Sequence, residues 1–263
     1  MTSLAQMLKK SELPITMRME RFLSSGDPVY SPDELEFALD VFSGVIGGNR
    51  KGRARLFRAS GAGRCLRERM FARMGVPEER GVNSQLQNIF TNGNFAHLRW
   101  QMAGITEGWL AQAEVPADDE ALGIGSTLDG ILWDESILEF KSINTRGFTM
   151  IHDYGANYKH KMQLHYMFKT TGRAAGSIVY EDKNSQDWRE ERVVLDPEIM
   201  NDVNTELNAL LGGWESQSLP PMKPKCKTEE GAEYRNCPFR KVCPILTTWT
   251  KAVNATPTKE ITS

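Results

Sequence analysis

The amino-acid sequence predicts an α/β fold, in which a short central mixed β-sheet is flanked by helices. Two patterns predict it. Apolar residues recur at helical spacing in several stretches up to Met102, and from Trp109 to Ile143 they follow the alternation that is typical of strands. A chain of 263 residues, 40% of them apolar, is long enough to bury a sizeable core as one large domain or two small ones.

The first 58 residues are predicted to form a helical and peripheral region. Ser31 and Glu34 have the spacing of a capping box, and Pro32 occupies the first helical position. We expect Gly47-Gly48 to end the helix that begins there.

Residues 59–249 are predicted to form the main domain. Its first helices are expected at 65–74 and 85–102. Three consecutive strands of an antiparallel meander are expected at 110–115, 125–133 and 137–143. They are followed by a helix at 158–170, extended runs at 175–180 and 191–195, and a helix at 197–214. Residues 250–263 are predicted to be a tail that is frayed from Ala252 onward.

The most informative stretch carries two carboxylates and a lysine. Glu139 and Lys141 are two residues apart, so they share one face of a strand. If Trp133 pairs with Ile137 around a three-residue loop, Asp129 lies opposite Lys141 and the three side chains converge. Acids that hold one or two Mg²⁺ or Mn²⁺ ions, beside a lysine that orients the nucleophile, suit phosphodiester hydrolysis. The alternative is an Asp-Gly turn and an exposed charged strand without catalytic function.

The order of the motifs resembles the RecB-like branch of the PD-(D/E)XK nucleases, over about 60–243. That family has a Gly-x-x-x-His helix before the sheet, then an aspartate, then Glu-x-Lys, then a helix with glutamine and tyrosine. In this sequence the corresponding segments are Gly93 to His97, Asp129, Glu139 to Lys141, and Gln163 to Tyr166. The resemblance implies a restriction-endonuclease-like core and a metal-dependent deoxyribonuclease.

The resemblance also implies a set of metal ligands. They would be His97, Asp129, Glu139 and the backbone carbonyl of Phe140. A single histidine on a partly apolar helix is more often a core residue than a ligand, and the order of the motifs around His97 is what favours the ligand.

The resemblance further implies that Gln163 and Tyr166 complete the catalytic set, as contacts to DNA or to Lys141. The family pattern has three residues between the glutamine and the tyrosine, whereas two stand between them here. His165 or Met167 would then occupy the expected position in place of the tyrosine.

The four cysteines are predicted to bind metal, because a few clustered cysteines in a cytoplasmic protein are more often ligands than disulfides. Cys65 precedes the catalytic motifs, while Cys226, Cys237 and Cys243 follow them. This layout resembles the iron-sulfur nucleases of the AddB type and of the fourth CRISPR-associated protein family, which implies a 4Fe-4S cluster that clamps the fold. Cys226 departs from the family spacing. Zinc is the alternative, although the two short Cys-x-x-Cys motifs of many structural zinc sites are absent from the sequence.

A basic segment is predicted to bind DNA phosphates. The whole chain has a net charge of -2, but from Arg50 to Arg80 ten Lys and Arg residues stand against three acids. The alternative is a solvated helix face. The arginines selected as DNA contacts are Arg53, Arg55, Arg58, Arg64 and Arg67.

Taken together, these features predict an exonuclease that acts on single-stranded ends or unwound DNA in phage or bacterial recombination or replication. A chain of this length has no room for a helicase, so it would act alone or with a separate partner protein. Two other classes are a catalytically inactive DNA-binding module of a recombination complex and a metal-dependent hydrolase of small molecules.

The expected location is the cytoplasm of a bacterium or of a phage-infected host cell. No apolar run approaches the roughly 20 residues that span a bilayer, and the N-terminal residues lack the features of a secretory signal. No membrane partner is therefore predicted.

Overall fold

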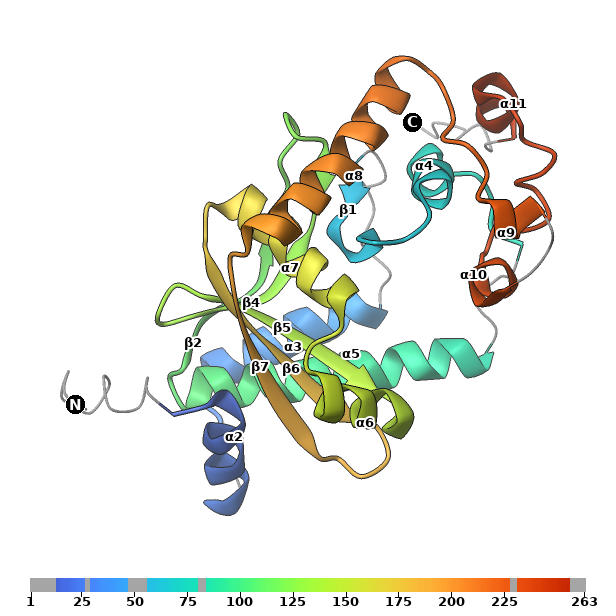
Figure 1. Cartoon of the computed structure of the whole chain (residues 1–263). Helices are drawn as coiled ribbons and strands as arrows, with labels where there is room; N and C mark the ends of the chain where they lie inside the picture. Colours follow the sequence, from blue (N-terminus) through green and yellow to red (C-terminus); the bar gives the residue numbers. More distant parts are fainter. Residues whose placement is uncertain (1–12, 27–28, 47–55, 80–83, 228–230, 256–263) are drawn as a thin grey trace, which may run out of the picture.

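A five-stranded mixed sheet forms the centre of the molecule, with strand order β2-β4-β5-β6-β7 (Figure 1). The computed structural model describes residues 13–26, 29–46, 56–79, 84–227 and 231–255. The five strands are β2 (Leu110–Pro116), β4 (Thr127–Leu132), β5 (Ile137–Ile143), β6 (Ala175–Asp182) and β7 (Trp188–Val194). β5 and β6 are parallel, and the other neighbours are antiparallel. The predicted mixed α/β class is confirmed, and the predicted meander is β2-β4-β5.

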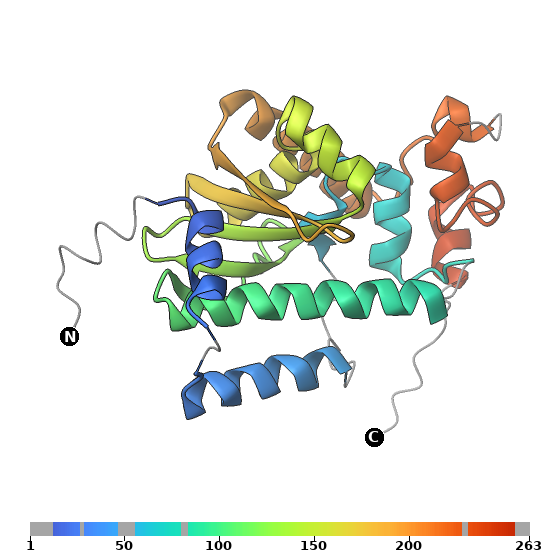
Figure 2. The same cartoon turned by 90° about the horizontal axis from the view of Figure 1, so that it is seen from below.

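Helices cover both faces of this sheet (Figure 2). On one face lies α5 (Ser84–Thr106), with α3 (Pro32–Ile46) outside it, and on the other lie α6 (Thr145–Tyr154), α7 (Tyr158–Thr171) and α8 (Pro197–Glu215). Trp100 of α5 packs in one core with Phe140 and Val179, while Leu164 of α7 packs in a second core with Ile178. No helix among the described residues has the length and apolar character needed to cross a membrane.

The N-terminal helices are more closely integrated than predicted. α2 (Ile15–Ser24) buries Ile15 and Met19 in the same core as Trp100, so this helix is not peripheral. The capping box at the start of α3 is confirmed, because Ser31 and Glu34 exchange backbone-to-side-chain hydrogen bonds. The predicted helix end at Gly47-Gly48 lies outside the described residues.

A third core joins helix α4 to residues near the C-terminal end of the described chain. Its helices are α4 (Leu66–Met74) and α11 (Trp249–Asn254). The short helices α9 (Pro224–Lys227) and α10 (Gly231–Asn236) precede α11 in the chain. Phe71 of α4 packs against Phe239, and Ala252 of α11 is fully buried with them. The expectation that the chain is frayed from Ala252 was therefore wrong for α11. Two short strands, β1 (Phe57–Arg58) and β3 (Ile124–Gly125), pair beside a 3₁₀ turn, η1 (Ala59–Gly61).

The β4–β5 hairpin departs from the predicted register. Ile131 pairs with Ile137, so Asp129 comes opposite Glu139 and not opposite Lys141. The loop has three residues as predicted but begins one residue earlier, and its last residue, at position 135, takes the left-handed φ of 63°. A shift of two residues leaves every side chain on its predicted face, so the catalytic side chains still converge.

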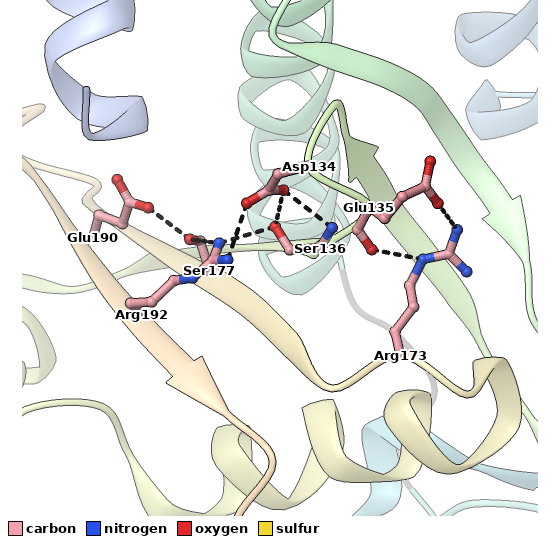
Figure 3. Close-up of polar contacts among 7 residues, drawn as sticks. All are labelled: Asp134, Glu135, Ser136, Arg173, Ser177, Glu190 and Arg192. Carbon is pink, nitrogen blue, oxygen red and sulfur yellow. Dashed lines mark hydrogen bonds and ion pairs between the residues drawn. The ribbon is translucent and has the colours of Figure 1, made fainter. Parts of the chain in front are cut away.

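Side chains from later in the sequence hold this loop in place (Figure 3). Asp134 accepts hydrogen bonds from the Ser136 N–H at 3.1 Å and from Arg192 Nη2 at 3.0 Å. Arg173 donates to the main-chain carbonyl of Glu135 at 2.8 Å and to its carboxylate at 2.7 Å. These contacts favour the observed register, because a shift of two residues would move Asp134 and Glu135 away from both arginines.

Candidate active site

Four of the five predicted catalytic residues, all except Tyr166, line one cavity of about 200 Å³. Asp129 comes from β4, Glu139 and Lys141 come from β5, and Gln163 comes from α7. Further side chains that line the cavity include Arg58, Asn94, His97, Gln101, Glu114 and Met167.

Glu139 is the most deeply buried acid of this cavity, at 3% exposure, and it forms an ion pair with Lys141. Gln163 links the two, since its Nε2 donates to Glu139 Oε1 at 2.7 Å and its Oε1 accepts from Lys141 Nζ at 3.1 Å. Glu139 Oε2 is buried without a hydrogen-bond partner among the described residues. Burial raises the pKa of Glu139 to about 7, although the nearby Lys141 ammonium lowers it.

Asp129 connects this group to α5. Its Oδ1 lies 3.3 Å from His97 Nδ1, and its Oδ2 accepts the backbone N–H of Phe140 at 2.7 Å. Burial raises the pKa of the Asp129 carboxyl, but His97 opposes this and brings it below its usual range. The predicted roles of His97 and of the Phe140 carbonyl as metal ligands remain predictions.

A divalent cation fits the oxygen atoms of this cavity. In the part of the chain that the structure describes, no three His, Cys, Asp or Glu side chains stand together as a ready metal site. Here the acids are paired with His97 and Lys141 instead. Two buried side-chain oxygens of this cavity, Glu139 Oε2 and Gln101 Oε1, nevertheless have no hydrogen-bond partner among the described residues. Hard cations such as Mg²⁺ and Mn²⁺ prefer oxygen ligands, so Asp129 and Glu139 would hold the ion.

Gln101 and Glu114 were not predicted from the sequence. Gln101 Nε2 donates to Glu114 Oε1 at 2.9 Å and to the main-chain carbonyl of Asp129 at 2.9 Å. A signal for Gln101 was present, because it follows His97 by four residues on the same helix face. No comparable signal marked Glu114, since its orientation depends on an irregularity in β2.

Tyr166 does not reach the cavity, which corrects its predicted catalytic role. Its side chain is fully buried, and its hydroxyl lies 3.0 Å from Arg69 Nη1 and 2.9 Å from Glu206 Oε1. Of the two alternatives, Met167 lines the cavity, whereas His165 accepts a hydrogen bond from a main-chain N–H at the start of α8. Tyr166 belongs to the packing between α4, α7 and α8.

Glu206→Gln is expected to lower the free energy of unfolding by about 3–5 kcal/mol, because the Arg69 side chain, 4% exposed, would lose its ion-pair partner. Tyr166→Phe is the matched control, since it removes one hydroxyl from the same network and is expected to cost about 1 kcal/mol. Urea unfolding followed by circular dichroism measures both. A Glu206→Gln variant as stable as the wild type would contradict this account of the network.

The basic segment is partly internal. Arg67 is buried and donates to the main-chain carbonyls of Pro220 and Leu246, which ties α4 to the C-terminal residues. The guanidinium of Arg73 stacks on Trp214, with its carbon 3.9 Å from the ring centre. Arg67 is therefore an internal arginine that joins two parts of the chain, which contradicts its predicted contact with DNA.

Two of the selected arginines remain candidates for DNA contact. Arg58 lines the catalytic cavity, and Arg64 is 58% exposed beside Glu68. Arg53 and Arg55 lie outside the described residues.

The double substitution Arg58→Gln and Arg64→Gln is expected to flatten the salt dependence of DNA binding. Each lost phosphate contact lowers the log–log slope by about 0.9 on duplex and about 0.7 on single strands. Fluorescence anisotropy at several salt concentrations measures the slope. Arg21→Gln is a control, because this exposed arginine lies on α2 and pairs with Glu107. An unchanged slope in the double variant would identify the two arginines as solvated surface charges.

The four cysteines line another cavity, of about 330 Å³, and none is in a disulfide. Burial raises the pKa of Cys237 to about 11 and also raises the pKa of Cys243. The cavity brings Cys65 beside the C-terminal residues, although no three of the thiols stand together as a metal site in the described chain. Four thiols that line one cavity and form no disulfide fit a four-thiolate cluster by their chemistry.

Comparison with known proteins gives distant structural likenesses. No protein-family model matches the chain, and no curated protein matches it in sequence. It is similar to the crystal structure of LHK-Exo in complex with dAMP, at 21% identity and a TM-score of 0.49, over 62% of this chain and 90% of that one. An alkaline exonuclease (LHK-Exo) from Laribacter hongkongensis gives 20% identity and a TM-score of 0.46 over the same shares. The crystal structure of SSO0001 is similar at 18% sequence identity and a TM-score of 0.45, over 81% of this chain and 97% of that one.

Proposed function

We propose that the protein is a metal-dependent deoxyribonuclease that acts as an exonuclease on single-stranded ends or unwound DNA. The observation that carries the proposal is the buried Glu139 carboxylate, whose second oxygen has no partner among the described residues while its first is held by Lys141 and Gln163. A buried carboxylate oxygen without a donor favours a cation.

The two acids, the lysine and the glutamine of the cavity then have definite tasks. A divalent cation bound by Asp129 and Glu139 would polarise the scissile phosphate and lower the pKa of the attacking water. Lys141, held by Gln163, is placed to orient that water and to balance negative charge on the phosphate. Burial lowers the pKa of Lys141, but Glu139 and Asp129 raise it above its usual value, so the amine stays charged at neutral pH.

We also propose that Cys65, Cys226, Cys237 and Cys243 hold a 4Fe-4S cluster, with zinc as the alternative occupant. Support comes from the shared cavity and from the absence of disulfides among them. A role in phage or bacterial recombination or replication, a partner protein and a cytoplasmic location rest on the family resemblance alone.

A cleavage assay with end-labelled single- and double-stranded DNA tests the function. With Mn²⁺ or Mg²⁺ we expect mononucleotides to be released stepwise from single-stranded ends, and we expect no product when EDTA removes the metal. Circular single strands should resist, because an exonuclease needs an end. If the protein binds DNA but cleaves none of these substrates with either Mn²⁺ or Mg²⁺, the result would instead favour an inactive DNA-binding module.

A further inference from the structure

Three carboxylates stand in a row across β2, β4 and β5. The β2–β4 register pairs Ala113 with Gly130 and Val115 with Leu128, so by position Glu114 is level with Asp129. The β4–β5 pairing ends at Gly130 and Leu138, and one further step along both strands brings Asp129 level with Glu139. A one-residue shift of register near the start of β2 makes this possible. Without it Glu114 would stand opposite Leu128, whose side chain faces the other side of the sheet.

The main chain at Glu114 is strained. Its φ of 51° lies in the left-handed region, which is costly for a residue with a side chain. Such strain persists where the surroundings hold it, and it is concentrated at functional sites. Here the carboxylate of Glu114 accepts the hydrogen bond from Gln101 Nε2.

Glu114 sets the orientation of the Gln101 amide. Gln101 is 1% exposed, and its Nε2 faces two acceptors, the Glu114 carboxylate and the Asp129 carbonyl. A carboxylate and a carbonyl can only accept, so the reversed amide would face them with its oxygen. Gln101 Oε1 is left buried in the wall of the catalytic cavity, without a hydrogen-bond partner among the described residues.

We propose that Glu114 is a positioning residue for the catalytic metal. Through Gln101 it holds the main chain at Asp129 and presents Gln101 Oε1 as an acceptor for a water on the cation. The inference rests on the proposed function, because it assumes that Asp129 and Glu139 bind that cation. Hydrogen bonds that support metal ligands typically change metal affinity by about 10–100-fold when they are removed.

Mn²⁺ binding to the full-length protein without DNA, measured by electron paramagnetic resonance of the free ion, tests this role. Glu114→Gly is expected to weaken Mn²⁺ binding by about 10–100-fold, while the Tm stays near the wild-type value because glycine accepts the positive φ. Gln217→Gly is the matched control, since Gln217 also has a φ of 51°. This residue is exposed, follows α8 and does not line the catalytic cavity. It should leave Mn²⁺ affinity unchanged.

Glu114→Gln provides a second variant that keeps the size of the side chain. Its amide can donate to Gln101 Oε1, so only the Asp129 carbonyl still favours the observed orientation of Gln101, and a loss of Mn²⁺ affinity in the same direction is expected. If both variants bind Mn²⁺ with wild-type affinity, the inference is overturned, but the proposed nuclease activity is not affected. If the wild type binds Mn²⁺ but does not cleave DNA, and both variants bind Mn²⁺ more weakly, the inference is supported and the proposed nuclease activity is refuted. A wild type that binds no Mn²⁺ overturns both.

Discussion

Lys141→Met is expected to reduce DNA cleavage by at least about 10³-fold while the protein still folds and binds DNA. Lys141 is the one cation that contacts both Glu139 and Gln163 among the described residues. Its loss would remove the positive charge that the proposed mechanism uses to orient the attacking water. Asp129→Asn and Glu139→Gln should give losses of similar size, because each removes a metal-binding carboxylate. The three effects should not add, since the groups act as a unit.

Single-turnover cleavage of labelled DNA measures these losses, with fluorescence anisotropy to show that binding persists. Lys251→Met is a suitable control, because this lysine is exposed on α11 and lies outside the catalytic cavity. It should cleave at the wild-type rate. Normal turnover from any two of the variants at Asp129, Glu139 and Lys141 would reject the proposed active site.

The convergence of the catalytic side chains was predictable because strand side chains alternate with a period of two. A register error of two residues leaves the side chains of Asp129, Glu139 and Lys141 on the same face of the sheet. The predicted pairing was in error by that amount. The pairing itself was not predictable, since it depends on contacts of Arg173 and Arg192, which come from later parts of the chain.

Other features escaped sequence reasoning for equally physical reasons. α7 buries seven consecutive residues, from Met162 to Phe168, so no amphipathic pattern could show that Tyr166 faces α8 rather than the cavity. The helix α6 was missed because it is short and contains Gly147 near its start. Arg67 looked like a surface charge, and only the fold supplies the carbonyl groups that satisfy it inside the protein.

Replacing Cys65, Cys237 or Cys243 with alanine is expected to remove the bound cluster and to lower the free energy of unfolding substantially. A cluster held by these thiols would join α4 to the C-terminal residues and close a loop of most of the chain, which restricts the unfolded state. Ligand binding energy is also folding energy when the unfolded chain has no preformed site. The thiols alone give no such stabilisation, and burial raises the pKa of Cys237 to about 11, so without metal it stays protonated at neutral pH.

Anaerobic purification, visible absorption and metal analysis measure the cluster. The wild type should be brown with about four irons per chain, and each of the three variants should be colourless and unfold at lower temperature. Asp129→Asn is the matched control, because it lies in the other cavity and should stay brown while cleavage is lost. Cys226→Ala is the most informative variant, since Cys226 departs from the family spacing yet lines the same cavity. We expect this variant to be colourless as well. Colourless wild-type protein with one zinc per chain would reject the iron-sulfur cluster but leave Asp129, Glu139 and Lys141 as the site of hydrolysis.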